Sequence, residues 1–256
     1  MKRIYQGLTT SIMGQWIYYM KKVDSTNKVA RSFAERGAEE GTVILAEEQS
    51  AGRGREGRVW HSPPGGVYLS VILRPRIHPK EAPPLALMVG LAASKAIGVN
   101  LGRVAHLKWP NDVLIDGKKI AGILLESSST PEKLNWVVAG VGINLNVRLE
   151  DLPEDVRGTA TSLLVEKGEE VDRELFLKDL LYYLDLLYLR FMDRRFVGMK
   201  EDWIKHSSTI GKWVRVSTPQ AELEGVAEDL KPDGSLVLKN DKMEWTISTG
   251  DCLHLR

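Results

Sequence analysis

The sequence predicts an α+β protein with two parts: a main body built on a mixed sheet with helices packed on one side, and a small SH3-like β-barrel at the C-terminal end. Two observations lead to this fold class. Strand-type and helix-type apolar spacings alternate along most of the chain, whereas the last part contains only short β-type runs joined by turns. With 256 residues, 43% of them hydrophobic, the chain can bury a sizeable core. We expect the boundary near Ser207–Ile210, which gives domains 1–207 and 208–256.

The first elements follow from apolar spacing and from capping residues. IYYMKKV (17–23) reads as a strand, and DSTNKVARSFAERG (24–37) reads as a helix that Asp24 and Ser25 can cap and that Gly37 ends. TVILAEE and VYLSVILRP are expected to be strands, separated by a loop rich in Gly and Arg and by a turn at SPPGG.

The second half of the main body alternates again. Leu85–Val99 is apolar at helical spacing, and three strand-like segments follow: VAHLKW, KIAGILLE and LNWVVAGVGINLNV. Asp116-Gly117 and the serine run SSST are expected to be the turns between them. RELFLKDLLYYLDLLYLRFM is expected to be a long, largely buried helix, because it is apolar on most of its surface. The barrel strands are GKWVRV, ELEGVAEDL, GSLVLKN and MEWTIST.

Composition excludes several classes of protein. The chain has 35 Lys+Arg against 34 Asp+Glu, a formal charge of +1, which argues against a nucleic-acid-coating protein. The single cysteine, Cys252, rules out an internal disulfide and fits a reducing cytosol; it has no convincing partners for a nucleophile. No signal peptide is recognised and no window is judged apolar for the length of a bilayer, so we expect a cytoplasmic protein without membrane partners.

The Gly-Arg loop, Gly52 to Gly57, formally matches the dinucleotide pattern G-x-G-x-x-G. The match fails in context, because RVWHSPPGG cannot start a helix and no acidic residue follows at the required distance. The loop arginines instead offer planar forks for carboxylate or phosphate, and glycines would let the loop open as a lid. On this interpretation the arginines gain anionic partners only when ligand is present. The alternative is a solvated surface loop.

Two further motifs place cations beside polar groups. In Lys108-Trp109-Pro110-Asn111-Asp112, the amide and carboxylate could orient a nucleotide and its Mg²⁺; the alternative is a strand end and turn with Trp109 in the core. In KKIAGILLE, Lys119 enters an apolar strand, where a partly buried ammonium needs an anionic partner, unless it is simply the exposed first residue.

A fourth motif, GVGINLN (140–146), has two glycines inside a strand. Such glycines indicate that another backbone or a ligand approaches closely, or that the strand contains a bulge.

Together and in this order, DSTN, EEQSAGRGREGRVW, KWPNDVL, KKIAGILLE and GVGINLN resemble the biotin protein ligase family. The resemblance extends through the long helix and the C-terminal part. It implies the mixed-sheet catalytic domain of biotin and lipoate ligases. It also implies a two-step reaction. Biotin and ATP give biotinyl-5′-AMP and pyrophosphate, and biotin then passes to a lysine of a biotin carboxyl carrier protein.

The resemblance also implies the site residues. Those for biotin are Ser25, Thr26, Asn27, Gln49, Arg53, Gly54, Arg55 and Lys119, and Gly122 and Leu124 suit the apolar part of the ligand. Those for ATP are Arg55, Arg58, Trp60, Lys108, Asn111, Asp112 and Asn144. We expect Lys119, Arg55 and Mg²⁺ to stabilise the charge of the first step, and Asp112 to orient the carrier amine or accept its proton and to bind Mg²⁺.

Three expectations concern partners and alternatives. By resemblance the protein forms a homodimer. Many relatives carry an N-terminal helix-turn-helix domain, but only about two dozen residues precede DSTN, so the chain is expected to be a monofunctional ligase, or a trimmed one, that does not bind DNA. A lipoate–protein ligase and a biotin-sensing regulator without ligase activity remain as alternatives.

Overall fold

The structure is a computed structural model that describes residues 7–255, and its main feature is a seven-stranded mixed sheet. The strand order is β1-β2-β3-β7-β6-β5-β4. Only β1 and β2 pair in parallel, and every other neighbouring pair is antiparallel. The strands are β1 (Ile17–Val23), β2 (Val43–Gln49), β3 (Val67–Leu73), β4 (His106–Lys108), β5 (Asp112–Ile115), β6 (Lys118–Ser129) and β7 (Leu134–Ile143). The predicted mixed-sheet α+β class is therefore confirmed.

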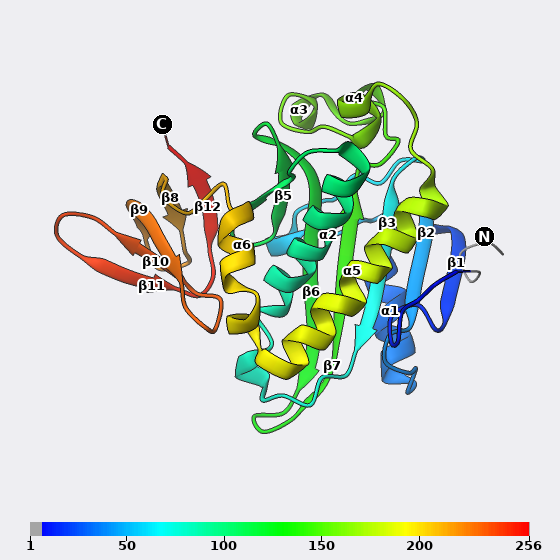
Figure 1. The fold of residues 1–256 in the computed structure, drawn as a ribbon, viewed down its shortest axis with the longest axis horizontal. Coiled ribbons are helices and arrows are strands. Elements are labelled where there is room, and N and C mark those ends of the chain that lie inside the picture. The colour runs from blue at the N-terminus through cyan, green and yellow to red at the C-terminus, as the bar shows by residue number, and fades with distance from the viewer. Residues whose placement is uncertain (1–6, 256) are drawn as a thin grey trace.

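Helices cover both faces of this sheet, not one face as expected. Side chains alternate along each strand, so Val43 and Leu45 join the core cluster with α2 (Leu85–Leu101) and α5 (Arg173–Arg194). Ile44 points the other way and packs with α1 (Thr26–Glu35). Figure 1 shows α2 and α5 in front of the sheet and α1 behind it. The reason is visible in β2, whose residues Val43–Ala46 are all buried. A strand that is apolar at every position needs a helix layer on each face of the sheet.

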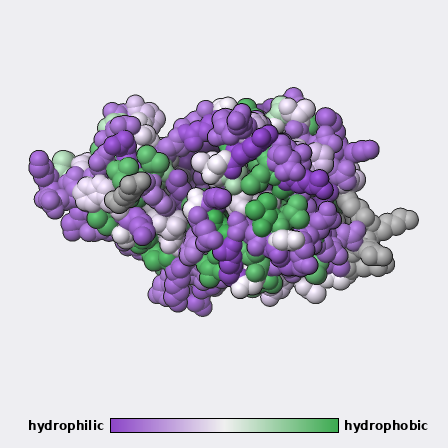
Figure 2. Space-filling model, turned by 90° about the horizontal axis from the view of Figure 1, so that it is seen from above, coloured by the Kyte–Doolittle hydropathy of each residue, from purple (hydrophilic) through white to green (hydrophobic). Residues whose placement is uncertain are grey.

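Helix α5 is less buried than its composition suggests. One face packs in the core, but Leu175, Tyr182, Leu186 and Leu189 are exposed. A single layer of helix covers this side of the sheet, so the outer side of α5 faces solvent even where it is apolar. Elsewhere the surface is largely polar, and Figure 2 shows a mainly hydrophilic face with apolar side chains in limited groups.

Helix α2 corrects the expectation that no window is long and apolar enough for a bilayer. Pro79–Leu101 passes that test by length and composition, with a mean hydropathy of 1.5, but 67% of the window is buried inside the fold. The helix packs on β5, β6 and β7 of the sheet and beside α5. Its apolar character therefore reflects its place in the core.

Two local differences lie near the end of the sheet. The segment after the KWPN turn forms β5, which had not been expected as a strand. The serine run does not make a turn: Ser127, Ser128 and Ser129 continue β6 and pair with β7, and the turn lies just beyond them. The pairing satisfies the backbone groups of these serines, and this outweighs the turn preference of their side chains.

The C-terminal part is a five-stranded antiparallel sheet in the order β11-β10-β9-β8-β12. The arrangement is consistent with the predicted SH3-like barrel. Its strands are β8 (Trp213–Ser217), β9 (Glu222–Leu230), β10 (Leu236–Lys239), β11 (Glu244–Ile247) and β12 (Asp251–His254). The remaining helical segments are η1 (Arg55–Gly57), η2 (Pro79–Glu81), η3 (Leu149–Asp151), α3 (Glu154–Arg157), α4 (Leu163–Lys167), η4 (Phe196–Gly198) and α6 (Lys200–His206).

The buried Trp109 joins the two sheets. Its indole Nε1 donates to the carbonyl of Gly234 at 3.1 Å, and its backbone N donates to Thr209 Oγ1 at 3.0 Å. Thr209 Oγ1 also lies 3.1 Å from His254 Nε2. The alternative interpretation of the KWPND motif is thus correct in placing Trp109 in the core, and the neighbours of Trp109 in this motif are held where the two parts meet. The division into domains 1–207 and 208–256 stays a prediction.

Candidate active site

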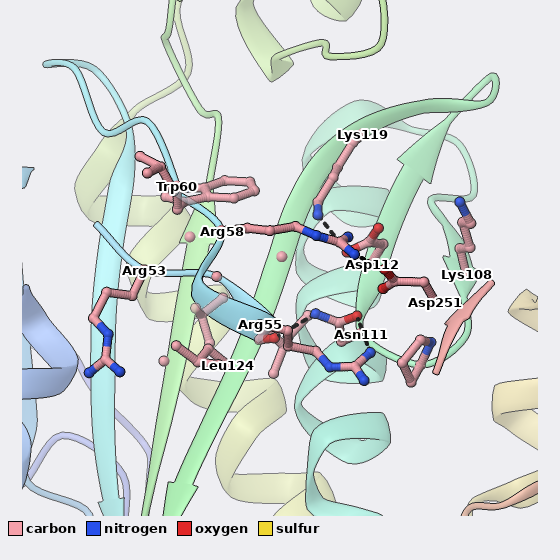
Figure 3. Close-up of a pocket in the computed structure, with 18 of the residues that line it drawn as sticks. Arg53, Arg55, Arg58, Trp60, Lys108, Asn111, Asp112, Lys119, Leu124 and Asp251 are labelled. Carbon is pink, nitrogen blue, oxygen red and sulfur yellow. Dashed lines mark hydrogen bonds and ion pairs between the residues drawn. The ribbon is translucent and has the colours of Figure 1, made fainter. Parts of the chain in front are cut away.

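A cavity of about 430 Å³ opens where the ends of β2, β6 and β7 meet the Gly-Arg loop and the C-terminal sheet. It collects residues that are far apart in the sequence (Figure 3). Of the residues assigned to the site, all but Asn144 line this cavity: Ser25, Thr26, Asn27, Gln49, Arg53, Gly54, Arg55, Arg58, Trp60, Lys108, Asn111, Asp112, Lys119, Gly122 and Leu124. Such a concave, mixed polar and apolar site is typical of small-molecule binding.

Three strand glycines let Trp60 and Asn27 pack directly on the sheet. Gly122 and Gly142 pair in register on β6 and β7. A Cβ on Gly142 would lie 2.4 Å from Trp60 Nε1, and a Cβ on Gly140 would lie 2.0 Å from Asn27 Oδ1. The glycines therefore mark close approach of side chains, and the alternative of a bulge is wrong here because the register around them is regular.

The polar end of the cavity is built by α1 and the end of β2. Ser25 is the N-cap of α1, but its side chain makes no capping hydrogen bond. Thr26 donates from its backbone N to Gln49 Oε1 at 2.8 Å, and its Oγ1 lies 3.1 Å from the same oxygen. Gln49 Nε2 donates to Ser62 Oγ at 2.8 Å. The hydroxyl and amide groups here are thus fixed in position, and Ser25 Oγ is left for a ligand.

Glu126 contacts two residues that line the cavity, and the sequence interpretation did not assign it. Its Oε2 accepts from Asn27 Nδ2 at 2.9 Å, and its Oε1 accepts from Arg53 Nη1 at 3.0 Å. Figure 3 shows the Arg53 side chain directed away from Arg55, Arg58 and Lys119. Strand alternation could have found Glu126, because Gly122, Leu124 and Glu126 share one face of β6.

The cationic part of the cavity centres on Lys119 and Asp112. Lys119 Nζ lies 2.7 Å from Asp112 Oδ1 and 5.4 Å from the centre of the Trp60 ring. The Lys119 side chain is 36% exposed, so it is neither fully solvated nor buried. The ammonium has a partner in the protein and also faces the open cavity, where an anionic ligand could approach it.

The arginines of the Gly-Arg loop already have partners without any ligand, which corrects one expectation. Arg55 donates to Thr249 Oγ1 at 3.0 Å, to the carbonyl of Gly250 at 3.3 Å and to Asn111 Oδ1 at 3.4 Å. Arg58 forms an ion pair with Asp251. Desolvation lowers the pKa of Arg55, although a guanidinium remains protonated. The fold places acceptors from β12 and its preceding turn against the loop, and the loop sequence gives no sign of them.

A smaller cavity of about 140 Å³ adjoins the first and contains Asn144, the one assigned residue outside the main cavity. Trp60 and Lys119 line both cavities. Asn144 Nδ2 donates to the carbonyl of Thr161 at 3.0 Å. Asn144 Oδ1 and Trp60 Nε1 are both buried and have no hydrogen-bond partner among residues 7–255. An unpaired acceptor and donor beside a cavity suit a polar ligand.

The carboxylate of Asp112 suits a metal ion that enters the cavity already bound to phosphate groups of a ligand. Within residues 7–255, no group of three or more His, Cys, Asp or Glu side chains is placed to hold a metal. Asp112 is the carboxylate nearest Lys119, and Mg²⁺ is often bound by one or two carboxylates together with substrate phosphates.

The C-terminal sheet supplies one wall of the main cavity, through Arg215, Ser217, Glu222, Asp251, Cys252 and Leu253. None of these was assigned from sequence, since nothing in a short β-strand pattern indicates what it will face. Burial raises the pKa of Cys252 to about 11. The thiol is therefore protonated near neutral pH, which agrees with the expectation that Cys252 is not a nucleophile.

Comparison with known proteins supports the assignment. The model of the Biotin/lipoate A/B protein ligase family matches residues 19–144, and that of the Biotin protein ligase C terminal domain matches residues 209–255. The Bifunctional ligase/repressor BirA of Bacillus subtilis is 37% identical over 237 residues, covering 92% of this chain and 73% of that protein. The Biotin--[acetyl-CoA-carboxylase] ligase of Paracoccus denitrificans is 35% identical over 224 residues, covering 86% of this chain and 92% of that protein.

A solved structure shows the same relation in three dimensions. The biotin protein ligase from Aquifex aeolicus in complex with biotin and ATP has a TM-score of 0.81 and 29% identity, covering 94% of this chain and 99% of that one. The two family matches, the identity to full-length relatives and the shared fold agree with one another. The chain belongs to the biotin protein ligase family.

Proposed function

We propose that this protein is an ATP-dependent biotin protein ligase, which forms biotinyl-5′-AMP from biotin and ATP and transfers biotin to a lysine of a biotin carboxyl carrier protein. One observation carries the proposal: the wall of a single cavity contains fixed polar groups around Thr26 and Gln49, the strand residues Gly122, Ile123 and Leu124, and the cation Lys119. These are the three environments that the ring, the body and the carboxylate of biotin require.

In the proposed complex, the ureido ring lies at the polar end. The ring carries two N–H donors and one C=O acceptor, so it needs both kinds of partner. Ser25 has a hydroxyl free of intramolecular capping, and Thr26 and Gln49 supply oxygens. The thioether ring and acyl chain then pass over Gly122 and Leu124 toward Lys119. A lipoyl dithiolane would leave the polar groups at this end unpaired, which favours biotin.

In the first step, a carboxylate oxygen of biotin attacks the α-phosphorus of ATP. The new bond joins that oxygen to phosphorus, and the bond to the β-phosphate oxygen breaks to release pyrophosphate. Two anions have to meet, so cations must stabilise the transition state. Lys119 and Arg55 are assigned to this role, because both reach the cavity beside Asp112 and Asn111.

The adenine ring is assigned to the smaller cavity. Trp60 forms part of its wall, and Asn144 Oδ1 and Trp60 Nε1 are a buried acceptor and donor in need of partners. Adenine offers an exocyclic N–H donor and ring-nitrogen acceptors to match them. Arg58 and Lys108 then lie on the phosphate side, in the main cavity.

Mg²⁺ is proposed to enter as part of the substrate Mg·ATP. Asp112 and Asn111 would hold it together with phosphate oxygens, and the ion would screen the charge of the leaving pyrophosphate.

In the second step, the neutral amine of the carrier lysine attacks the acyl carbon and AMP leaves. Asp112 is assigned to orient this amine or to accept its proton, since it is the carboxylate beside the reacting end.

The acceptor is proposed to be the biotin-carrying domain of a carboxylase, as the name of the Paracoccus denitrificans relative indicates for that enzyme. We further propose a homodimer, a cytoplasmic location and no sequence-specific DNA binding by this chain. The near-neutral charge supports the last point.

The test is to incubate the protein with biotin, Mg·ATP and a biotin carboxyl carrier domain and to measure the mass of the carrier. A gain of one biotinyl group that requires both substrates is expected. Lipoate in place of biotin, with a lipoyl domain as acceptor, is the control for the related activity. Lipoyl transfer without biotinyl transfer would reject the proposal, and so would biotin binding without any transfer.

A further inference from the structure

We infer that Glu126 sets the direction of the hydrogen bonds under the ureido end of the cavity and so makes Thr26 an acceptor toward the ligand. This inference rests on the proposed function. Glu126 does not line the cavity itself, and its side chain is 20% exposed. It is therefore a positioning residue for ligand selection rather than a catalytic residue.

The argument begins at Asn27. Its Nδ2 lies 2.9 Å from Glu126 Oε2 and 3.4 Å from the carbonyl of Leu124, and both of these groups can only accept. The opposite orientation of the amide would place Oδ1 against two acceptors. Glu126 therefore fixes which way the Asn27 amide points, with Oδ1 directed at Ser70.

The next link is Ser70, which is fully buried. Ser70 Oγ lies 2.7 Å from Asn27 Oδ1 and 2.8 Å from Thr26 Oγ1. A hydroxyl has one proton, and an amide oxygen cannot donate. Ser70 therefore gives its proton to Asn27, and its oxygen can only accept from Thr26.

The chain is fixed from its other end as well. Ser62 Oγ donates to the carbonyl of Trp60 at 3.0 Å, so it accepts from Gln49 Nε2. This turns Gln49 Oε1 toward Thr26, 3.1 Å from its Oγ1. The Thr26 proton is thus surrounded by acceptors on the protein side.

A ligand that enters the cavity consequently meets the free lone pairs of Thr26, not its proton. This suits a ureido N–H and disfavours a carbonyl at the same place. Ser25, whose side chain makes no capping bond, remains able to donate to the ureido oxygen. The network distinguishes the two edges of the ring.

At position 126, only a carboxylate can accept hydrogen bonds from two neighbouring donors at once. Asn27 Nδ2 and Arg53 Nη1 each need an acceptor. A glutamine offers one acceptor and one donor, so Glu126→Gln leaves one donor facing another unless Asn27 turns over. If Asn27 turns over, Ser70 has to donate to Thr26, and the direction of the chain reverses.

The experiment compares Glu126→Gln with the double variant Asn27→Asp/Glu126→Gln. In the double variant, the new amide at position 126 can donate to the new carboxylate at position 27 and still accept from Arg53. That carboxylate in turn still accepts from Ser70, so every donor again has an acceptor. Glu35→Gln is the matched control, because Glu35 is an exposed carboxylate on α1 that also pairs with an arginine, at 3.8 Å.

The readouts are the KM for biotin and the KM for ATP in pyrophosphate release, together with the thermal midpoint. We expect Glu126→Gln to raise the KM for biotin about tenfold or more, the effect of one mispaired buried hydrogen bond, with the KM for ATP unchanged. The double variant should recover most of the loss, as contacting residues do in a double-mutant cycle, and Glu35→Gln should match the parent.

Three results would overturn the inference in a parent protein that forms the adenylate: an unchanged KM for biotin in Glu126→Gln, an equal rise in both KM values with a lower thermal midpoint, or a folded double variant that recovers nothing. A parent that forms no adenylate would instead reject the proposed function.

Discussion

At the scale of single residues, Lys119 carries the most specific assignment. In the proposed first step it meets a carboxylate and a phosphate, and its Nζ lies 2.7 Å from Asp112 Oδ1. Lys119→Ala is expected to slow adenylate formation by a hundredfold or more, because loss of one such donor costs on the order of 3 kcal/mol in the transition state. The measurement is the rate of pyrophosphate release at saturating substrates. Lys118→Ala, which removes the exposed neighbour, should have little effect. A Lys119→Ala rate within a few-fold of the parent would remove Lys119 from the reaction.

Gly142 provides a second residue-scale prediction. A methyl group there would lie 2.4 Å from Trp60 Nε1, so Gly142→Ala should displace the indole from the sheet. We expect a raised KM for ATP, since Trp60 lines the proposed adenine cavity. Gly158→Ala is the matched control: nothing lies within 4 Å of its added Cβ, and its φ of −68° is ordinary. An unchanged ATP response in Gly142→Ala would show that adenine binds elsewhere.

The resemblance carried by motifs such as KWPND and the Gly-Arg loop named residues that, apart from Asn144, line one cavity, although each motif alone left an alternative open. It did not predict Glu126, whose role depends on which strand lies beside α1. Nor did it predict Asp251, which meets Arg58 only after the C-terminal sheet has docked. Partners of this kind are set by tertiary packing and leave no local pattern.

At the scale of elements, the Gly-Arg loop connects the two sheets. The single side chain of Arg55 donates hydrogen bonds to Asn111 of the main body and to Thr249 and Gly250, which directly precede β12 in the C-terminal sheet. The Gly-Arg loop is therefore held against both sheets by protein contacts. Most of the longer elements were predictable from periodicity. The exceptions are the short helices α3, α4 and α6, which the sequence analysis did not predict, and β5 and the serine end of β6, where pairing overrode local preference.

Arg55→Gly tests the loop as a latch. The variant should form biotinyl-5′-AMP more slowly, because Arg55 is also assigned to the first step, and should release the product tens-fold faster, if about 2–3 kcal/mol of charge-assisted bonding is lost. The released anhydride would then acylate lysines of bystander proteins. Labelling of serum albumin, blotted for biotin, measures this, and Arg55→Lys should label less than Arg55→Gly because it keeps the charge. Background labelling with Arg55→Gly, at an amount of adenylate formed equal to that of the parent, would exclude the latch.

At the scale of the whole molecule, the junction between the sheets contains a titratable group. His254 lies 3.1 Å from Thr209 Oγ1, which accepts from the backbone N of Trp109. Burial, and then the positive charges of Lys108 and Lys212, lower the pKa of His254 below 6.5. The unfolded chain therefore binds the proton more readily than the folded one. The stability that the neutral imidazole contributes is fully present above pH 6.5 and is lost as the pH falls through the lowered pKa.

His254→Gln should accordingly reduce the loss of stability below pH 6.5, because glutamine can still bond Thr209 but does not titrate in this range. The measurement is the free energy of unfolding in urea at pH 7.5 and pH 5.5 for parent and variant. His106→Gln, an exposed substitution on β4, is the control. The same pH dependence in the parent and in His254→Gln would show that other groups control acid stability.

The position of β12 has a practical consequence for anyone who would use this enzyme as a labelling tool. Asp251, Cys252 and Leu253 form a wall of the cavity, so a fusion partner joined behind Arg256 would begin three residues from that wall. Residues 7–16, which precede β1, lie on the side of the molecule opposite the C-terminal sheet in Figure 1, where Ser11, Ile12 and Met13 donate to Asp185 of α5. A targeting module or affinity tag therefore belongs on the N-terminal side, away from the cavity that the carrier lysine has to reach in the proposed second step.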